Sequence, residues 1–252
     1  MKPDLRAVLS LAMLAGLLAA APARAEDAPP TCEVPAYLLS SESALPKVAE
    51  AVKSSGKLDI LVVGSRSSTI NTADGTAYPG RLEAVLREKL PGVKVNVNVE
   101  LQIKKTAEEV AAGLSRLVEG KKPTLVIWQT GTVDAMRSID PDDFRAAVDD
   151  GVAALQSAGT DVILMNLQYS PRTDTMISAA PYIDNMRVVA QQHDVPLFDR
   201  FAVMRHWNEA GDFDLFSTFH GPELARRVHE CLGRGLSKFV IDAAHIGPAQ
   251  QN

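Results

Sequence analysis

Short apolar runs alternate with longer amphipathic stretches along most of this chain, and this alternation constrains the fold more than any other feature. The apolar runs, rich in Val, Ile and Leu, predict strands, and the longer stretches, with apolar residues at helical spacing, predict helices. The predicted strands are 58–63, 93–99 (strictly alternating, so an edge strand), 124–128, 161–167 and 196–198, and the predicted helices are 79–90, 106–119, 141–158, 180–193 and 222–243. Strands that alternate with helices indicate an α/β fold, in which helices cover both faces of a parallel sheet.

The carboxyl ends of the predicted strands are the expected place for a functional site. In α/β folds with parallel sheets, binding and catalytic groups lie outside these ends. Catalytic or binding residues are therefore expected in the turns after Val63, Val99, Trp128 and Leu167, and in the loop before Pro222.

The first 25 residues have the three parts of a secretory signal peptide. Lys2 and Arg6 are positively charged, residues 7–21 are apolar, and Ala23-Arg24-Ala25 forms a small-x-small cleavage site. A transmembrane anchor is the alternative, but about 15 apolar residues are too few to span a bilayer comfortably. The sequence therefore predicts a periplasmic or secreted protein that is cleaved near Ala25.

The rest of the chain is expected to form one domain. We predict an N-terminal extension over 26–45, the α/β domain over 46–243 and a flexible tail over 244–252. After the leader no stretch of about 20 apolar residues follows, so no membrane span is predicted.

The charge balance excludes some classes of partner. The net charge is −5, and loss of the leader with Lys2, Arg6, Arg24 and Asp4 makes it −7. An acidic chain without a basic cluster lacks the electrostatic footprint of a nucleic-acid-binding protein. It also lacks the positive charge that docks proteins on anionic membranes. Of the partner classes considered, a small molecule or a glycan is still possible. The sequence does not indicate an oligomeric state.

Cys32 and Cys231 are the two cysteines of the chain, near opposite ends of the mature protein. In an oxidising compartment such a pair can form a disulfide. Two separate buried thiols are the alternative.

The turn after the first predicted strand is rich in hydroxyl groups, with the sequence Gly64-Ser65-Arg66-Ser67-Ser68-Thr69. A serine in a tight turn at a strand end can be a catalytic nucleophile. The same composition is also typical of turns in which hydroxyls bond their own backbone. The chain contains no G-x-S-x-G, P-loop, H-E-x-x-H or C-x-x-C motif, so no cofactor or metal is predicted.

Several blocks together resemble the SGNH (GDSL-type) hydrolases, in particular exported bacterial members with a G-S-S-S-T turn. The blocks are 64–69, Tyr78-Pro79-Gly80-Arg81-Leu82, 126–133 (VIWQTGTV), 164–171 (LMNLQYSP) and 201–207 (FAVMRHW). The resemblance implies a three-layer αβα sandwich with a flavodoxin-like sheet and descent from ester hydrolases. It also favours a bridge between Cys32 and Cys231.

Laid on this chain, the family's catalytic groups are mostly replaced. The resemblance places the nucleophile at Ser67 and the oxyanion region at Gly131 and Val133, where Val133 stands in place of the usual Asn. Lys104, in the segment that replaces a glycine turn, is a candidate charge-based oxyanion stabiliser. The final D-x-x-H block falls on His220-Gly221-Pro222-Glu223, with neither catalytic residue in its usual position.

Two functions follow from this comparison. The first is a degenerate hydrolase whose cleft around Ser67 binds a glycan or an acyl-bearing component of the cell envelope. The alternative is an active carboxylic-ester hydrolase or deacetylase, in which His220 is the base for Ser67 and Glu223 orients it. Both residues also have plainer explanations, since an acid such as Glu223 stabilises a helix start and His220 precedes that helix.

Overall fold

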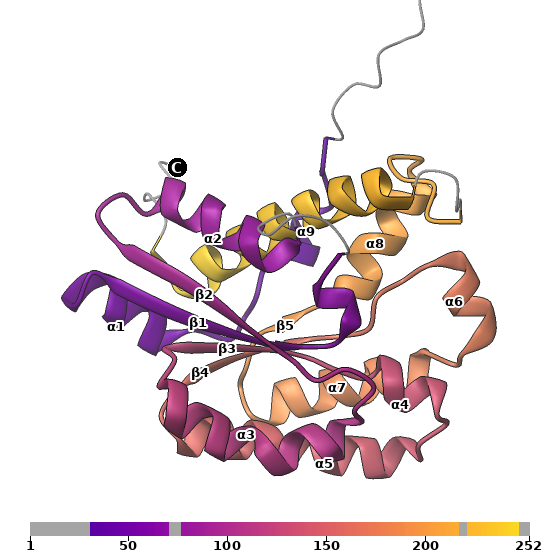
Figure 1. Cartoon of the computed structure of the whole chain (residues 1–252), viewed down its shortest axis with the longest axis horizontal. Coiled ribbons are helices and arrows are strands. Elements are labelled where there is room, and N and C mark those ends of the chain that lie inside the picture. The colour runs from indigo at the N-terminus through magenta and orange to yellow at the C-terminus, as the bar shows by residue number, and fades with distance from the viewer. Residues whose placement is uncertain (1–30, 71–76, 217–220, 247–252) are drawn as a thin grey trace, which may run out of the picture.

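The computed structural model describes residues 31–70, 77–216 and 221–246 of the chain (Figure 1). The predicted signal peptide, the end of the predicted tail and His220 lie outside these residues. Within them, no helix is long and apolar enough to cross a bilayer.

Five parallel strands form one sheet in the order β2-β1-β3-β4-β5. They are β1 (Lys57–Gly64), β2 (Lys94–Leu101), β3 (Leu125–Gln129), β4 (Asp161–Met165) and β5 (Leu197–Phe198). Every residue of β3 and β4 is buried, because helices cover both faces of the inner strands. β2 is only partly buried and lies at one edge of the sheet. The predicted parallel α/β sheet and its alternating edge strand are confirmed.

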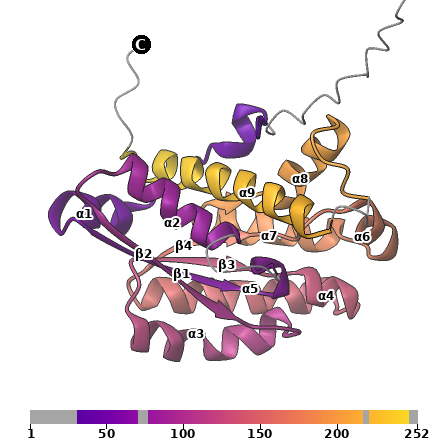
Figure 2. The ribbon, with the colours of Figure 1, turned by 45° about the horizontal axis from the view of Figure 1, so that its top comes forward.

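Helices form the two outer layers (Figures 1 and 2). α2 packs beside α9 on one face, and α3, α5 and α7 pack together on the other. The helices are α1 (Pro46–Ser54), α2 (Tyr78–Lys89), α3 (Ala107–Lys121), α4 (Thr132–Met136), α5 (Pro141–Ser157), α6 (Pro171–Met176), α7 (Ala180–Gln192), α8 (Arg200–Glu209) and α9 (Gly221–Ala243), with short 3-10 turns η1 (Ala36–Leu39) and η2 (Arg66–Ser68). The structure is thus the three-layer sandwich that the resemblance implies.

The fourth strand ends at Met165, although the apolar run continues to Leu167. Asn166 leaves the sheet and is fully buried at the start of α8. Its Oδ1 accepts a hydrogen bond from Phe201 N at 2.9 Å, and its Nδ2 donates one to Asp199 Oδ1 at 2.7 Å. Asn166 therefore fixes where α8 begins.

A disulfide joins Cys32 to Cys231 on α9. Next to it, Trp207 Nε1 donates a hydrogen bond to the carbonyl of Glu33 at 3.1 Å. These contacts attach the N-terminal segment to the helical layer that contains α9. The bridge favoured by the sequence is confirmed.

Candidate functional site

The serine-rich turn lies at the carboxyl end of β1, as the fold predicts. Ser65 begins the turn, and its hydroxyl accepts a hydrogen bond from Ser67 N at 3.4 Å. Gly64 has to be glycine, since a Cβ there would lie 2.1 Å from Ser68 Oγ. This close approach buries Ser68 and leaves the neighbouring Ser67 half-buried.

Gln129 at the end of β3 contacts the turn from the neighbouring strand. Its Oε1 accepts a hydrogen bond from Ser68 Oγ, which lies 3.0 Å from Tyr78 OH. Because the Ser68 proton is used on Gln129, the Tyr78 hydroxyl is the donor to Ser68. The amide nitrogen of Gln129 then points at Ser67 Oγ, at 2.7 Å, and at Ser65 Oγ, at 3.1 Å.

Arg200, the first residue of α8, reaches the same serine from the other side. Its Nη1 donates to Ser67 Oγ at 3.1 Å, and its Nη2 to Ser67 O at 3.2 Å and Gln168 Oε1 at 3.3 Å. The guanidinium lies 5.6 Å from the centre of the Tyr78 ring. Arg200 is 1% exposed, and this burial lowers its pKa to about 10. In the described residues, all of these partners are neutral.

Ser67 Oγ is the acceptor in its hydrogen bonds with Gln129 and Arg200. A hydroxyl has two lone pairs and one proton, and Gln129 Nε2 and Arg200 Nη1 occupy the two lone pairs. The remaining polar neighbour is Ser65 Oγ, at 3.1 Å. No imidazole or carboxylate of the described chain segments makes a hydrogen bond to Ser67.

His229 on α9 is close to this cluster but does not supply a base. Its Nδ1 accepts a hydrogen bond from Tyr78 N at 2.9 Å, and the two rings stack with centres 5.8 Å apart. Burial, and then the charge of Arg200, lower the pKa of His229 to about 3. The imidazole is therefore neutral, and the lone pair of its Nδ1 is already used by the Tyr78 amide.

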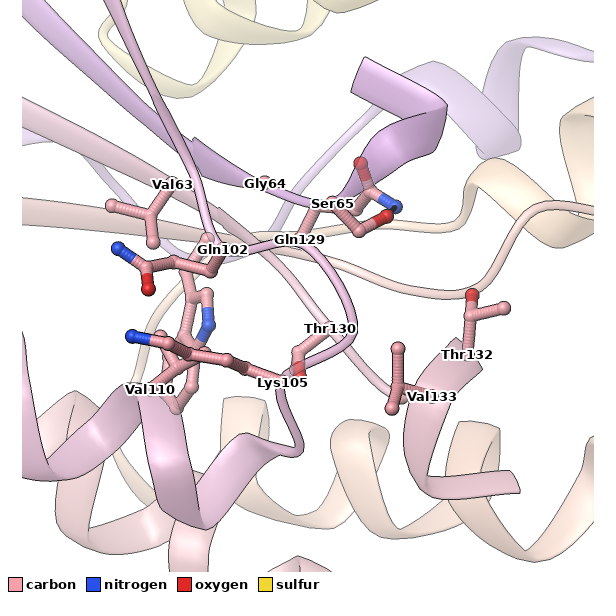
Figure 3. Close-up of a pocket in the computed structure, with 12 residues that line it drawn as sticks. Val63, Gly64, Ser65, Gln102, Lys105, Val110, Gln129, Thr130, Thr132 and Val133 are labelled. Atoms are coloured by element: carbon pink, nitrogen blue, oxygen red, sulfur yellow. Dashed lines mark hydrogen bonds between the residues drawn. The ribbon is translucent and has the colours of Figure 1, made fainter. Parts of the chain in front are cut away.

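A small pocket lies beside the turn, between the ends of β1 and β3 and the start of α4 (Figure 3). Ser65 and Gln129 form one side of it, and Val133 lies across from them. Its free volume is about 10 Å³, which is room for roughly one water molecule. Ser67 does not line this pocket but adjoins it, because its Oγ contacts the lining residues Ser65 and Gln129.

The predicted oxyanion residues are divided between the pocket and the surface. Gly131 and Val133 line the pocket, with an apolar side chain where the family has an Asn. Gly131 has a φ of 95°, and a Cβ there would lie 2.6 Å from Leu167 Cδ1, so glycine is needed at this position. Lys104 is exposed, and Lys105 lines the pocket in its place.

Glu223 lies in the first turn of α9, where it is exposed and forms a 2.6 Å ion pair with Arg226. This contact matches its plainer explanation as a helix-start acid. His220, its predicted partner, lies outside the described residues.

Two functional residues were missed from the sequence, Gln129 and Arg200. Gln129 is in the block 126–133 that carries the family resemblance, but no role was assigned to it. Arg200 follows the short predicted strand 196–198, so the rule that chemistry lies at strand ends also pointed to it.

Residues 31–246 match the non-GDSL lipase-like family. The chain belongs to this family. The family assignment confirms the predicted SGNH-type ancestry, and ester hydrolysis is therefore the ancestral chemistry of this fold. No curated protein matches the chain.

Solved structures, among them that of an acetylxylan esterase, share the fold at low sequence identity. Axe2, an acetylxylan esterase from Geobacillus stearothermophilus, is 18% identical, with 80% of this chain and 95% of Axe2 covered and a TM-score of 0.57. A G-D-S-L family protein from Desulfitobacterium hafniense is 16% identical, with 73% and 99% covered and a TM-score of 0.54. TesA is 20% identical, with 71% and 98% covered and a TM-score of 0.51. At these identities the similarity shows the fold.

Proposed function

We propose that this chain is an exported SGNH-fold protein that binds an acyl-bearing glycan at the Ser67 cleft and does not hydrolyse esters efficiently. The observation that carries the proposal is the surroundings of Ser67 Oγ, which accepts hydrogen bonds from Gln129 and Arg200. A serine nucleophile needs a base that takes its proton. Hydrogen bonds donated to its oxygen do not supply one.

The oxyanion region supports the same conclusion. Val133 has no hydrogen-bond donor in its side chain, at the position where the family uses an Asn. Loss of one oxyanion donor costs an esterase about a hundred- to a thousandfold in kcat. A site that lacks this donor, and to which the described residues supply no base, is better suited to hold a ligand than to cleave it.

The ligand class and the location follow from the fold family and the leader. One structural neighbour is an acetyl-xylooligosaccharide esterase, so an O-acylated sugar is the ligand class by analogy. The N-terminal leader and the disulfide both favour an oxidising compartment outside the cytoplasm.

The alternative is an ester hydrolase or deacetylase with Ser67 as nucleophile and His220 as base. The same two donors favour it in one respect, since hydrogen bonds from Arg200 and Gln129 would also stabilise an alkoxide at Ser67 Oγ. The alternative therefore predicts ester turnover that depends on Ser67 and His220, whereas the binding function predicts none.

Hydrolysis of p-nitrophenyl acetate and release of acetate from acetylated xylo-oligosaccharides distinguish the two functions. We expect the mature protein to react at the same rate as Ser67→Ala, while calorimetry detects binding of the intact oligosaccharide. Ser54→Ala is the matched control, because Ser54 lies exposed on α1 and bonds only the carbonyl of Glu50. Turnover that is lost in Ser67→Ala and His220→Ala but kept in Ser54→Ala would establish the enzyme instead.

A further inference from the structure

The Arg200 guanidinium is a buried charge that has no counter-charge in the described chain. Its hydrogen-bond partners are the hydroxyl and carbonyl of Ser67 and the side-chain oxygen of Gln168. Its Nε is also buried and makes no hydrogen bond. Proteins normally pair a buried charge, because leaving it uncompensated is costly. A negative charge that arrives with a ligand would supply the missing partner.

Ser67 connects this charge to the surface. Both of its lone pairs accept hydrogen bonds, one of them from Arg200, so its proton can turn either to Ser65 Oγ, at 3.1 Å, or to a ligand oxygen. Hydrogen bonds in a chain polarise one another, which makes a hydroxyl that accepts from a cation a stronger donor. Ser67 is partly exposed, and the acceptor that gains most from such a donor is an anionic oxygen.

The neighbourhood of Ser67 is positive although the protein is acidic. Arg66 in the same turn is exposed, and Lys105 lines the adjoining pocket. The residues that line this pocket include no Asp or Glu. Positive charge gathered at a cleft of a chain with a net charge of −5 favours an anionic ligand.

We propose that the Ser67 cleft binds the anionic oxygen of an acidic sugar, with Ser67 donating a hydrogen bond to it and Arg200 compensating its charge. This inference rests on the proposed binding function and names the ligand class of the same site. A carboxylate and a phosphate on the sugar share this chemistry, and the test separates them.

Three sugars that differ at C6 test the charge requirement. Glucose, glucuronate and glucose 6-phosphate are titrated into the mature protein and followed by calorimetry and by the amide NMR signals of Ser67 and Gln129. We expect glucuronate or glucose 6-phosphate to bind about tenfold or more tightly than glucose. Preference for glucuronate identifies a carboxylate, and preference for glucose 6-phosphate identifies a phosphate. Equal binding of all three sugars would overturn the inference while leaving a neutral, acylated ligand open.

Substitutions of Arg200 test the source of the selectivity. Arg200→Met should abolish the preference for the charged sugar, and Arg200→Lys, which keeps the charge, should retain part of it. Arg205→Met is the matched control, because Arg205 is an exposed arginine on the same helix. Unchanged selectivity in Arg200→Met would contradict the inference. The p-nitrophenyl acetate assay on the same samples reports separately on the proposed lack of turnover.

Discussion

The two ends of the sheet each bury a charged side chain, and only one of these charges is compensated by the described chain. At the amino end, Asp161 of β4 is 9% exposed, and its Oδ2 accepts a hydrogen bond from Val48 N at 2.9 Å. At the carboxyl end, Arg200 is 1% exposed and has neutral partners. The first charge is used by the fold, and the second is the one for which we propose a ligand as the partner.

Asp161 acts as a helix cap that is supplied from a distant part of the chain. α1 starts after Leu45, a residue that has no side-chain acceptor for the free amides of the first turn. The carboxylate of Asp161 takes over this task and also stabilises the positive end of the helix dipole. Burial raises the pKa of Asp161, and the amides of Val48 and Lys47 oppose that rise. The Asp161 carboxylate and the amides that stabilise it are therefore both part of the folded chain, and no ligand is needed.

The largest effect in this comparison is expected at the amino end. Asp161→Ala leaves the Val48 amide buried without an acceptor and should lower the free energy of unfolding by about 3 kcal/mol. Asp161→Asn is the matched control, since it keeps an oxygen acceptor and should lose about 1 kcal/mol. Urea denaturation of both variants measures the difference. Equal losses in the two variants would show that the hydrogen bond to Val48 is not the source of the stability.

A second, smaller effect is expected at the carboxyl end, where burial and the charge of Arg200 oppose protonation of His229. The folded-state pKa of His229 is about 3, against an ordinary value of 6.5. Below pH 6.5 the unfolded chain therefore binds a proton that the folded chain does not, so stability is lost as the pH falls. Between pH 7 and pH 5 this loss should be about 2 kcal/mol.

Urea denaturation of the wild type and His229→Asn at the two pH values measures this contribution. Asn keeps an acceptor for the Tyr78 amide but has no proton to gain in this range. The variant should therefore lose about 2 kcal/mol less than the wild type on acidification. The same loss in both proteins would mean that His229 is protonated in the folded state.

The sequence predicts the sheet better than the small helices. β1, β3 and β4 are runs of buried Val, Ile and Leu, and β2 alternates, so both patterns are visible in single segments. α4 and α6 have five and six residues, too few to show an apolar period. Strand 161–167 was predicted too long, because Leu167 is buried by packing and not by the sheet.

The site was predicted only in part, because its polar network joins residues far apart in the chain. Ser67 was found from its turn, but its contacts come from Gln129 and Arg200, which are 62 and 133 positions away. Neither burial nor hydrogen-bond partners of an arginine can be predicted from its neighbours in the sequence, since most arginines are exposed. The rule for strand ends locates the region, and tertiary structure decides which side chains meet there.

The smallest expected effect is on the stability of Arg200→Met, and it decides whether Arg200, unlike Asp161, is dispensable for folding. Replacement of a buried charge by an apolar side chain of similar volume is often neutral or stabilising. Arg200→Met removes the hydrogen bonds to Ser67 and Gln168 but also the cost of burying the charge, so unfolding in urea should change by less than about 1 kcal/mol. A loss as large as that of Asp161→Ala would make Arg200 a structural residue of the turn. A small change together with lost selectivity for the charged sugar would show that the fold retains this cation for its ligand, because stability alone gives no reason to keep it.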